Sequence, residues 1–177
     1  PIEVTAVPGN ANVTLQWTAP ASDGGRAIDH YIVYQEGVDV GHIDGTRLVL
    51  EGLLNGQTYG FSVSAHNLAG LGPSSAEVFA IPFSAPDAPT GLTAVAGNAN
   101  ISLNWTVPFD GGRGIHHYLV FLDGENVINV TDTRALIEGL TNGRTYEVQV
   151  VAENLAGLGS PSLEIMSTPY TKPDAPA

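Results

Sequence analysis

The sequence repeats itself once, and this repeat constrains the fold more than any other feature. Four motifs of the first half return in the second half at a nearly constant shift: 9–12 as 97–100, Trp17 as Trp105, 23–26 as 110–113, and 67–72 as 154–159. A repeat of this length indicates two copies of one structural unit rather than a single larger domain.

The segment between the two copies repeats as well. The motif Pro-Asp-Ala-Pro stands at 86–89 and again at 173–176. The sequence therefore predicts a first module over 1–82, a proline-rich linker over 83–89, a second module over 90–169, and the start of another linker over 170–177. We interpret the chain as two modules of a longer tandem array, whose neighbouring modules are its expected partners.

Each copy has the hydrophobic pattern of a β protein. Val13, Leu15 and Trp17 alternate with polar residues, as do their counterparts in the second copy, and this period of two is typical of a strand with one buried face. Further strands are predicted around 31–33, over 59–65, and, with weaker patterns, over 2–7, 47–51 and 75–81. Glycine, proline and asparagine separate them, which predicts six or seven short strands in each copy.

Composition excludes several classes of function. The chain has no cysteine, so it forms no disulfide and no cysteine-bound metal site. Its formal net charge is −12, and this argues against nucleic-acid partners and anionic membrane surfaces. No apolar run approaches the ~20 residues of a membrane span, so we expect no direct membrane insertion.

The two copies resemble fibronectin type III modules of prokaryotic secreted or surface proteins. The matching residues include Leu15-x-Trp17, Asp23-Gly24-Gly25, Tyr31-x-Val33, Thr58-Tyr59 and Asn67, with counterparts from Trp105 to Asn154. The resemblance implies an all-β fold of two tandem immunoglobulin-like β-sandwiches with about seven strands each. It also implies core roles, with a tyrosine corner at Tyr59 and Tyr146, for eight residues: Trp17, Tyr31, Leu53, Tyr59, Trp105, Tyr118, Leu140 and Tyr146.

No group of residues suggests catalysis, a metal site or a cofactor. The five histidines look scattered, and the adjacent His116 and His117 would point to opposite faces of a strand. Asp23-Gly24-Gly25-Arg26 and its repeat are interpreted either as a binding loop or, preferably, as turn chemistry in which Asp caps the turn and glycines take positive φ. We therefore expect a protein that is not an enzyme.

Leucines near the tips of loops suggest a contact between modules. Loops lie at both ends of each predicted sandwich. The short linker brings the end of the first module where its last strand finishes against the end of the second module where its first strand starts. We expect an inter-module contact formed by Pro8, Leu54, Phe109, Leu155 and Leu158.

Each copy also has an apolar stripe that is out of phase with its buried residues: Ile32 and Tyr34 in the first copy, and Leu119 and Phe121 in the second. The stripe is interpreted either as a half-covered strand face or as a surface for a ligand.

Four Asn-x-Ser/Thr sequons are candidate N-glycosylation sites: Asn12, Asn100, Asn104 and Asn129. The alternative explanation is that polar residues alternate on the outer face of a strand and create such triplets by chance. The two readings remain open at this point.

These patterns together predict a non-catalytic spacer or adhesion module pair of a secreted or cell-surface multidomain protein. The alternative is a pair of accessory linker modules in a secreted polysaccharide-degrading enzyme. Other surface proteins or polysaccharide are the candidate external partners. Both tryptophans are assigned to cores, which argues against an aromatic carbohydrate-binding platform.

Overall fold

The computed structural model describes residues 1–173, which form two separate compact units. Module 1 comprises Pro1–Ser84, and module 2 begins at Ala85. Within the described residues both modules consist of strands and loops, and no helix is long and apolar enough to cross a membrane.

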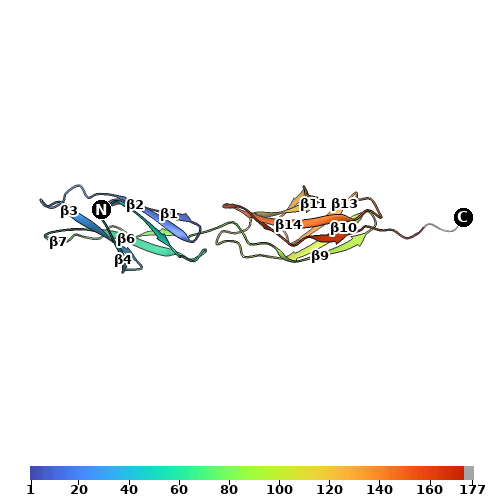
Figure 1. Ribbon diagram of the computed structural model, residues 1–177, viewed down its shortest axis with the longest axis horizontal. Coiled ribbons are helices and arrows are strands. Elements are labelled where there is room, and N and C mark those ends of the chain that lie inside the picture. Colours follow the sequence, from blue (N-terminus) through green and yellow to red (C-terminus); the bar gives the residue numbers. More distant parts are fainter. Residues whose placement is uncertain (174–177) are drawn as a thin grey trace. The chain divides into compact units, whose positions relative to one another are not determined.

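Module 1 is a sandwich of two antiparallel sheets (Figure 1). The first sheet has the strand order β1-β2-β5, and the second has the order β4-β3-β6-β7, with β8 also paired to β6. The strands are β1 (Ile2–Gly9), β2 (Asn12–Thr18), β3 (Ile28–Gln35), β4 (Val38–Ile43), β5 (Arg47–Glu51), β6 (Tyr59–Asn67), β7 (Gly70–Leu71) and β8 (Val78–Ala80).

Module 2 repeats this topology strand for strand. Its sheets have the orders β13-β10-β9 and β12-β11-β14-β15, with β16 also paired to β14. The strands are β9 (Thr90–Gly97), β10 (Asn100–Thr106), β11 (His117–Leu122), β12 (Glu125–Val130), β13 (Arg134–Glu138), β14 (Tyr146–Asn154), β15 (Gly157–Pro161) and β16 (Ile165–Ser167). The prediction of two tandem all-β sandwiches is confirmed.

Alternating residues of each strand fill the core between the sheets. Val13, Leu15 and Trp17 are buried along β2, and Tyr31 and Val33 are buried on the facing strand β3. The rings of Trp17 and Tyr31 meet edge to face with their centroids 5.5 Å apart. The second core has the same arrangement, since Trp105 and Tyr118 lie 5.4 Å apart. Burial raises the pKa of the Tyr118 hydroxyl.

A tyrosine fixes the loop before its own strand in both modules. The backbone N–H of Leu54 donates to the Tyr59 hydroxyl oxygen at 3.0 Å, and the N–H of Thr141 donates to that of Tyr146 at 2.9 Å. The backbone hydrogen bond from Thr141 is the main cause of a lowered pKa at Tyr146. Leu53 is buried beneath this loop, while its counterpart Leu140 is half-buried against the second core.

The structure contains two strands in each module that the hydrophobic pattern did not indicate: β4 and β12, and the shorter β7 and β15, where the glycines predict a turn. β4 and β12 are edge strands with mostly exposed residues, so they lack the alternation of a half-buried strand. In module 1, Glu36 and Gly37 link β3 to β4 with φ values of 51° and 77°, which suits a two-residue type I′ hairpin. The predicted strand over 75–81 is shorter, because only Val78–Ala80 pair with β6.

We predict that Trp17→Ala unfolds module 1 and leaves module 2 folded, with the reverse result for Trp105→Ala. Removing a large buried aromatic typically costs about 3–5 kcal/mol, which is much of the ~5–15 kcal/mol that stabilises a domain. Calorimetry would show one unfolding transition at its original temperature. The transition of the substituted module would be lost or would occur at a much lower temperature. A single substitution that destabilised both modules equally would contradict the model of two independent cores.

Candidate functional site

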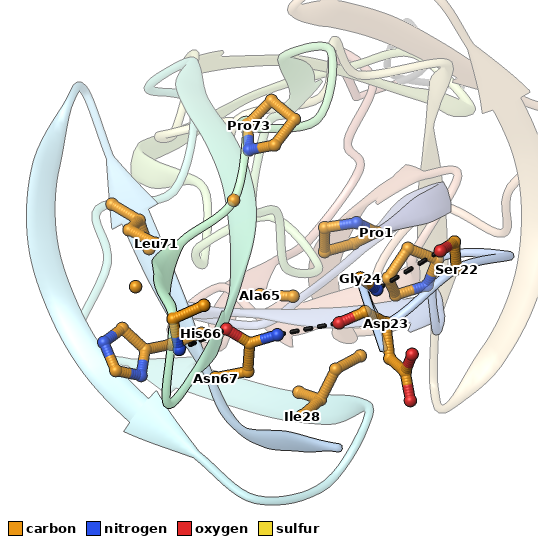
Figure 2. Close-up of a pocket in the computed structure, with 14 residues that line it drawn as sticks. Pro1, Ser22, Asp23, Gly24, Ile28, Ala65, His66, Asn67, Leu71 and Pro73 are labelled. Atoms are coloured by element: carbon orange, nitrogen blue, oxygen red, sulfur yellow. Dashed lines mark hydrogen bonds between the residues drawn. The ribbon is translucent and has the colours of Figure 1, made fainter. Parts of the chain in front are cut away.

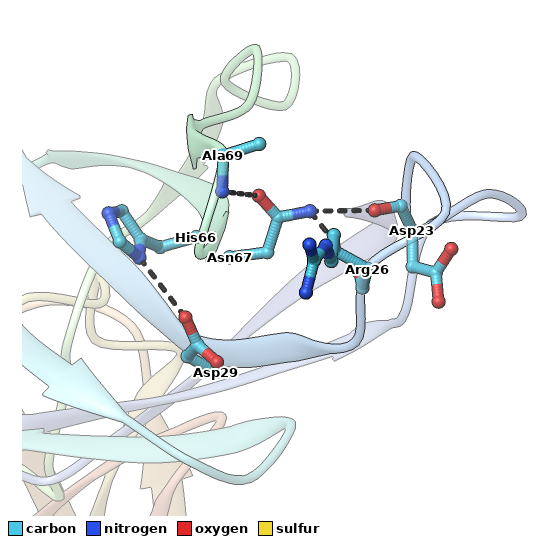
Figure 3. A network of polar contacts seen from close by, with 6 residues as sticks. All are labelled: Asp23, Arg26, Asp29, His66, Asn67 and Ala69. Atoms are coloured by element: carbon cyan, nitrogen blue, oxygen red, sulfur yellow. Dashed lines mark hydrogen bonds and ion pairs between the residues drawn. The ribbon is translucent and has the colours of Figure 1, made fainter.

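An asparagine side chain joins two loops at one end of module 1 (Figure 3). The Nδ2 group of Asn67 donates to the backbone oxygens of Asp23 at 2.7 Å and Arg26 at 3.2 Å. Its Oδ1 accepts from the N–H of Ala69 at 2.9 Å. The end of β6 therefore holds both the loop 22–26 and the hairpin 67–73.

The aspartate-glycine loop has the geometry of a capped turn. The Asp23 carboxylate accepts from the N–H of Gly25 at 2.8 Å, and Asp110 accepts in the same way from Gly112. Both glycines of each loop have positive φ, between 72° and 86°. The turn interpretation of this motif is thus confirmed, because its aspartate side chain and its two glycines are used to form the loop itself.

A cavity of about 400 Å³ lies between these two loops in module 1 (Figure 2). Ser22 and Asp23 line it from the first loop, and Leu71, Gly72 and Pro73 line it from the hairpin. We call this cavity the loop groove. Sequence analysis did not anticipate it, because the two loops are more than forty residues apart in sequence.

The residues expected to form the inter-module contact are largely exposed. Pro8 is half-buried at the end of β1. The exposed fractions of the four large apolar side chains are 67% for Leu54, 52% for Phe109, 64% for Leu155 and 53% for Leu158. In module 1, Leu68 and Leu71 occupy the positions of Leu155 and Leu158 and are also exposed.

Three histidines that look scattered in the sequence lie together on the outer face of module 1, and the expectation of scattered histidines is wrong. His30 on β3 stacks on His66 of β6 at 4.7 Å and on His42 of β4 at 5.0 Å. Cross-strand pairing brings them together, because His30 lies opposite His66 in the register of β3 and β6. Nevertheless, residues 1–173 hold no group of three or more metal-ligating side chains arranged for an ion.

Acidic groups flank both ends of this histidine row. Asp39 accepts a hydrogen bond from His42 at 2.9 Å, and Asp29 lies 3.8 Å from Nδ1 of His66. The matched positions of module 2 have different chemistry, since His117, the counterpart of His30, pairs with Glu153 at 2.9 Å across β11 and β14. The residues expected as an outer apolar stripe are half-buried in both modules: Ile32 and Tyr34 in module 1, and Leu119 and Phe121 in module 2.

The candidate glycosylation sites differ in exposure. Asn12 and Asn100 are half-buried, and each donates from Nδ2 to a backbone oxygen two residues earlier. Asn104 is exposed on β10, and Asn129 is exposed on β12, where its Oδ1 accepts from Asn126. Asn104 and Asn129 therefore present their side chains more openly than the other two.

We predict that His42→Asn raises the pKa of Asp39 toward its ordinary value. The hydrogen bond from His42 is the main cause of the lowered pKa, and the N–H of Gly41 adds to it. A lowered carboxyl pKa in the folded state stabilises the fold above the ordinary carboxyl pKa, and that stabilisation is lost as pH falls through the lowered value. Carbon-13 NMR titration of Asp39 measures the change, and His116→Asn in module 2 is the control. Identical Asp39 curves for wild type and His42→Asn would contradict the assignment.

Comparisons with known proteins agree with this architecture. The chain is 33% identical over 93% of its length to a Kelch domain-containing protein of Saccharolobus solfataricus, and 31% identical over 89% of its length to Chitinase A1 of Niallia circulans. It spans only 23% and 25% of those relatives. A crystal structure of several titin domains has the same fold, with a TM-score of 0.63 at 20% identity, over 93% of this chain and 61% of that one.

The match to a family is direct and covers both modules. The Fibronectin type III domain family matches residues 1–81 and again residues 87–168. These two ranges contain both sandwiches, both tyrosine-braced loops and both asparagine-held loop pairs described above. The chain therefore belongs to the fibronectin type III family, of which it contains two tandem domains.

Proposed function

We propose that this module pair is a non-catalytic spacer, one part of a tandem array in a secreted or surface-attached multidomain protein. Fibronectin type III domains are non-catalytic modules of larger proteins, and this chain spans about a quarter of the relatives described above. The observation that carries the proposal is how closely the linker is bound to each module.

The linker has few residues between its two anchors. On the side of module 1, the N–H of Phe83 donates to the oxygen of Gly9 at 3.0 Å, and the N–H of Gly56 donates to Pro82 at 2.9 Å. On the side of module 2, the N–H of Asp87 donates to the oxygen of Phe109 at 2.9 Å. Three residues, 84–86, separate the anchored Phe83 from the anchored Asp87. A linker this short, with proline at 82, 86 and 89, restricts the conformations available between modules.

The surface composition supports a location outside the cell. The net charge of −12 and the single lysine, Lys172, favour solubility. The exposed sequons at Asn104 and Asn129 would accept glycans there. We propose N-glycosylation at these two positions in preference to Asn12 and Asn100, whose amides are engaged in turns.

A second candidate function is that of accessory linker modules in a polysaccharide-degrading enzyme. The similarity to Chitinase A1 favours it. Trp17 and Trp105 are buried, so neither supplies an aromatic platform for sugar rings, and the modules would act as spacers in this setting too. Sequencing the complete gene separates the candidates, because an adjacent catalytic domain of a glycoside hydrolase would select the second.

We further propose that Leu155, Leu158 and Phe109 contact Leu54 and Pro8 of the preceding module. Four of these side chains are more than half exposed, although apolar surface favours burial. The contact would limit bending at the linker without making it rigid, because inter-domain contacts of this kind are modest in area.

We predict that Leu155→Ser with Leu158→Ser loosens the module pair. The chain has no native cysteine, so spin labels at Asp44→Cys and Thr131→Cys, both on exposed loops, report one inter-module distance. Double electron–electron resonance spectroscopy would show a distance distribution roughly twice as broad as that of the chain with the native leucines. The reason is that the apolar contact that limits bending is lost.

Leu68→Ser with Leu71→Ser is the matched control for this experiment. These leucines occupy the matching hairpin of module 1. In the proposed array, this hairpin would face a module that precedes module 1 and would not face module 2. The control should leave the distribution unchanged. Equal distributions for the wild type and the Leu155/Leu158 variant would refute the contact.

A further inference from the structure

Two asparagines of the sequence, Asn55 and Asn142, are followed directly by glycine, and they occupy the same turn in each module. In such a pair the glycine nitrogen can attack the side-chain carbonyl carbon of the asparagine, because glycine has no Cβ to hinder the approach. Asn-Gly turns at a protein surface are therefore candidates for deamidation. Gly56 and Gly143 are exposed, so water reaches both turns.

The turn that joins the first two strands of each module holds these asparagine side chains. Oδ1 of Asn55 accepts from the N–H of Ala11 at 2.9 Å, and its Nδ2 donates to Oδ1 of Asn10 at 2.9 Å. The same two bonds, at 2.8 Å and 2.7 Å, hold Asn142 on residues 98–99. The carboxamide that would react is thus fixed at both of its polar atoms.

The attacking nitrogens are bound by the segment that follows the last strand of each module. The N–H of Gly56 donates to the oxygen of Pro82 at 2.9 Å, and the N–H of Gly143 donates to that of Pro169 at 2.8 Å. Both prolines are buried, and we call the segments that begin with them the covering segments. Attack on the side chain requires the glycine nitrogen to lose its proton. A bonded N–H is withheld from base in solvent, as it is in amide hydrogen exchange.

We infer that Asn55 and Asn142 are deamidation sites that the covering segments keep closed. When a covering segment leaves its turn, the glycine nitrogen attacks Cγ of the asparagine and the C–N bond of the carboxamide breaks. Ammonia leaves with the proton from the glycine nitrogen, and a succinimide ring remains. Water then opens the ring at either carbonyl, which produces aspartate or isoaspartate.

Deamidation would make the release of a covering segment permanent. Aspartate has an oxygen where Asn55 donates to Oδ1 of Asn10, so that hydrogen bond is replaced by repulsion between two oxygens. Isoaspartate adds a methylene to the main chain of the turn and so displaces Gly56 from the oxygen of Pro82. This chemistry goes beyond the proposed spacer role and does not depend on it, because every contact involved lies within one module.

The test compares the full chain with Pro82→Gly and Pro169→Gly during incubation in mildly alkaline buffer. Each substitution removes a buried ring and frees the backbone of one covering segment. Peptide mass spectrometry should show Asn55 deamidating about tenfold faster in Pro82→Gly with Asn142 unchanged, and the reverse in Pro169→Gly. Pro73→Gly, at an exposed proline outside the covering segments, is the matched control and should change neither rate.

Hydrogen exchange by NMR separates the opening of a covering segment from the unfolding of a whole module. In Pro82→Gly, exchange of the Gly56 amide should accelerate by the same factor as deamidation of Asn55. The core amides of Val13 and Val63 should keep their protection, because the core between the sheets stays closed.

A second pair of variants leaves the buried proline in place. Phe83→Pro removes the N–H that donates to the oxygen of Gly9 at 3.0 Å, whereas Phe83→Ala removes the side chain and retains that N–H. Asn55 should deamidate about fivefold faster in Phe83→Pro than in Phe83→Ala, as the loss of one ordinary hydrogen bond allows.

Equal deamidation rates at Asn55 in the wild type, Pro82→Gly and Phe83→Pro would overturn the inference. So would a native chain that reacts as fast as a free peptide of residues 50–60. A faster reaction that always came with an equal loss of protection at Val13 and Val63 would overturn it too, since the whole module would then have to unfold.

Discussion

The edge-to-face contact between a tryptophan and a tyrosine ties together the two sheets of each module. Trp17 belongs to β2 of one sheet and Tyr31 to β3 of the other, and their centroids are 5.5 Å apart. Such aromatic pairs combine a large buried area with a defined geometry. With no cysteine to link the sheets, burial of this pair and the aliphatic residues around it must stabilise the sandwich. The loops and grooves at its ends depend on this core for their positions.

Sequence alone predicted the features that depend on local pattern. Alternation located the buried strands, and the repeat located the two modules, because both are visible within short windows of sequence. The capped Asp23 turn was predicted for the same reason. The edge strands β4 and β12 were missed, because strands exposed on most of their residues carry no alternating signal.

Features that depend on strand register could not be predicted in this way. The row of His42, His30 and His66 joins residues from three strands, and only the pairing of β3 with β4 and β6 brings them together. A one-residue shift in register would place the rings on opposite faces. The loop groove belongs to the same class, since its two walls meet through the hydrogen bonds of Asn67. The repeat makes such features interpretable afterwards, because each module serves as a reference for the other.

The hydrogen bonds that anchor the linker have a consequence for a pair placed under mechanical load. Tension along the chain acts on the linker and on both sandwiches in series, so the weakest attachments should give way first, and these include the bonds from Phe83 to Gly9 and from Asp87 to Phe109. Each is a single backbone hydrogen bond with a net strength of about 1 kcal/mol, far below the stability of a whole domain. Under a rising pull we expect these bonds to break and reform while both cores stay intact. A linker held in this way would lengthen reversibly under load before either domain unfolds.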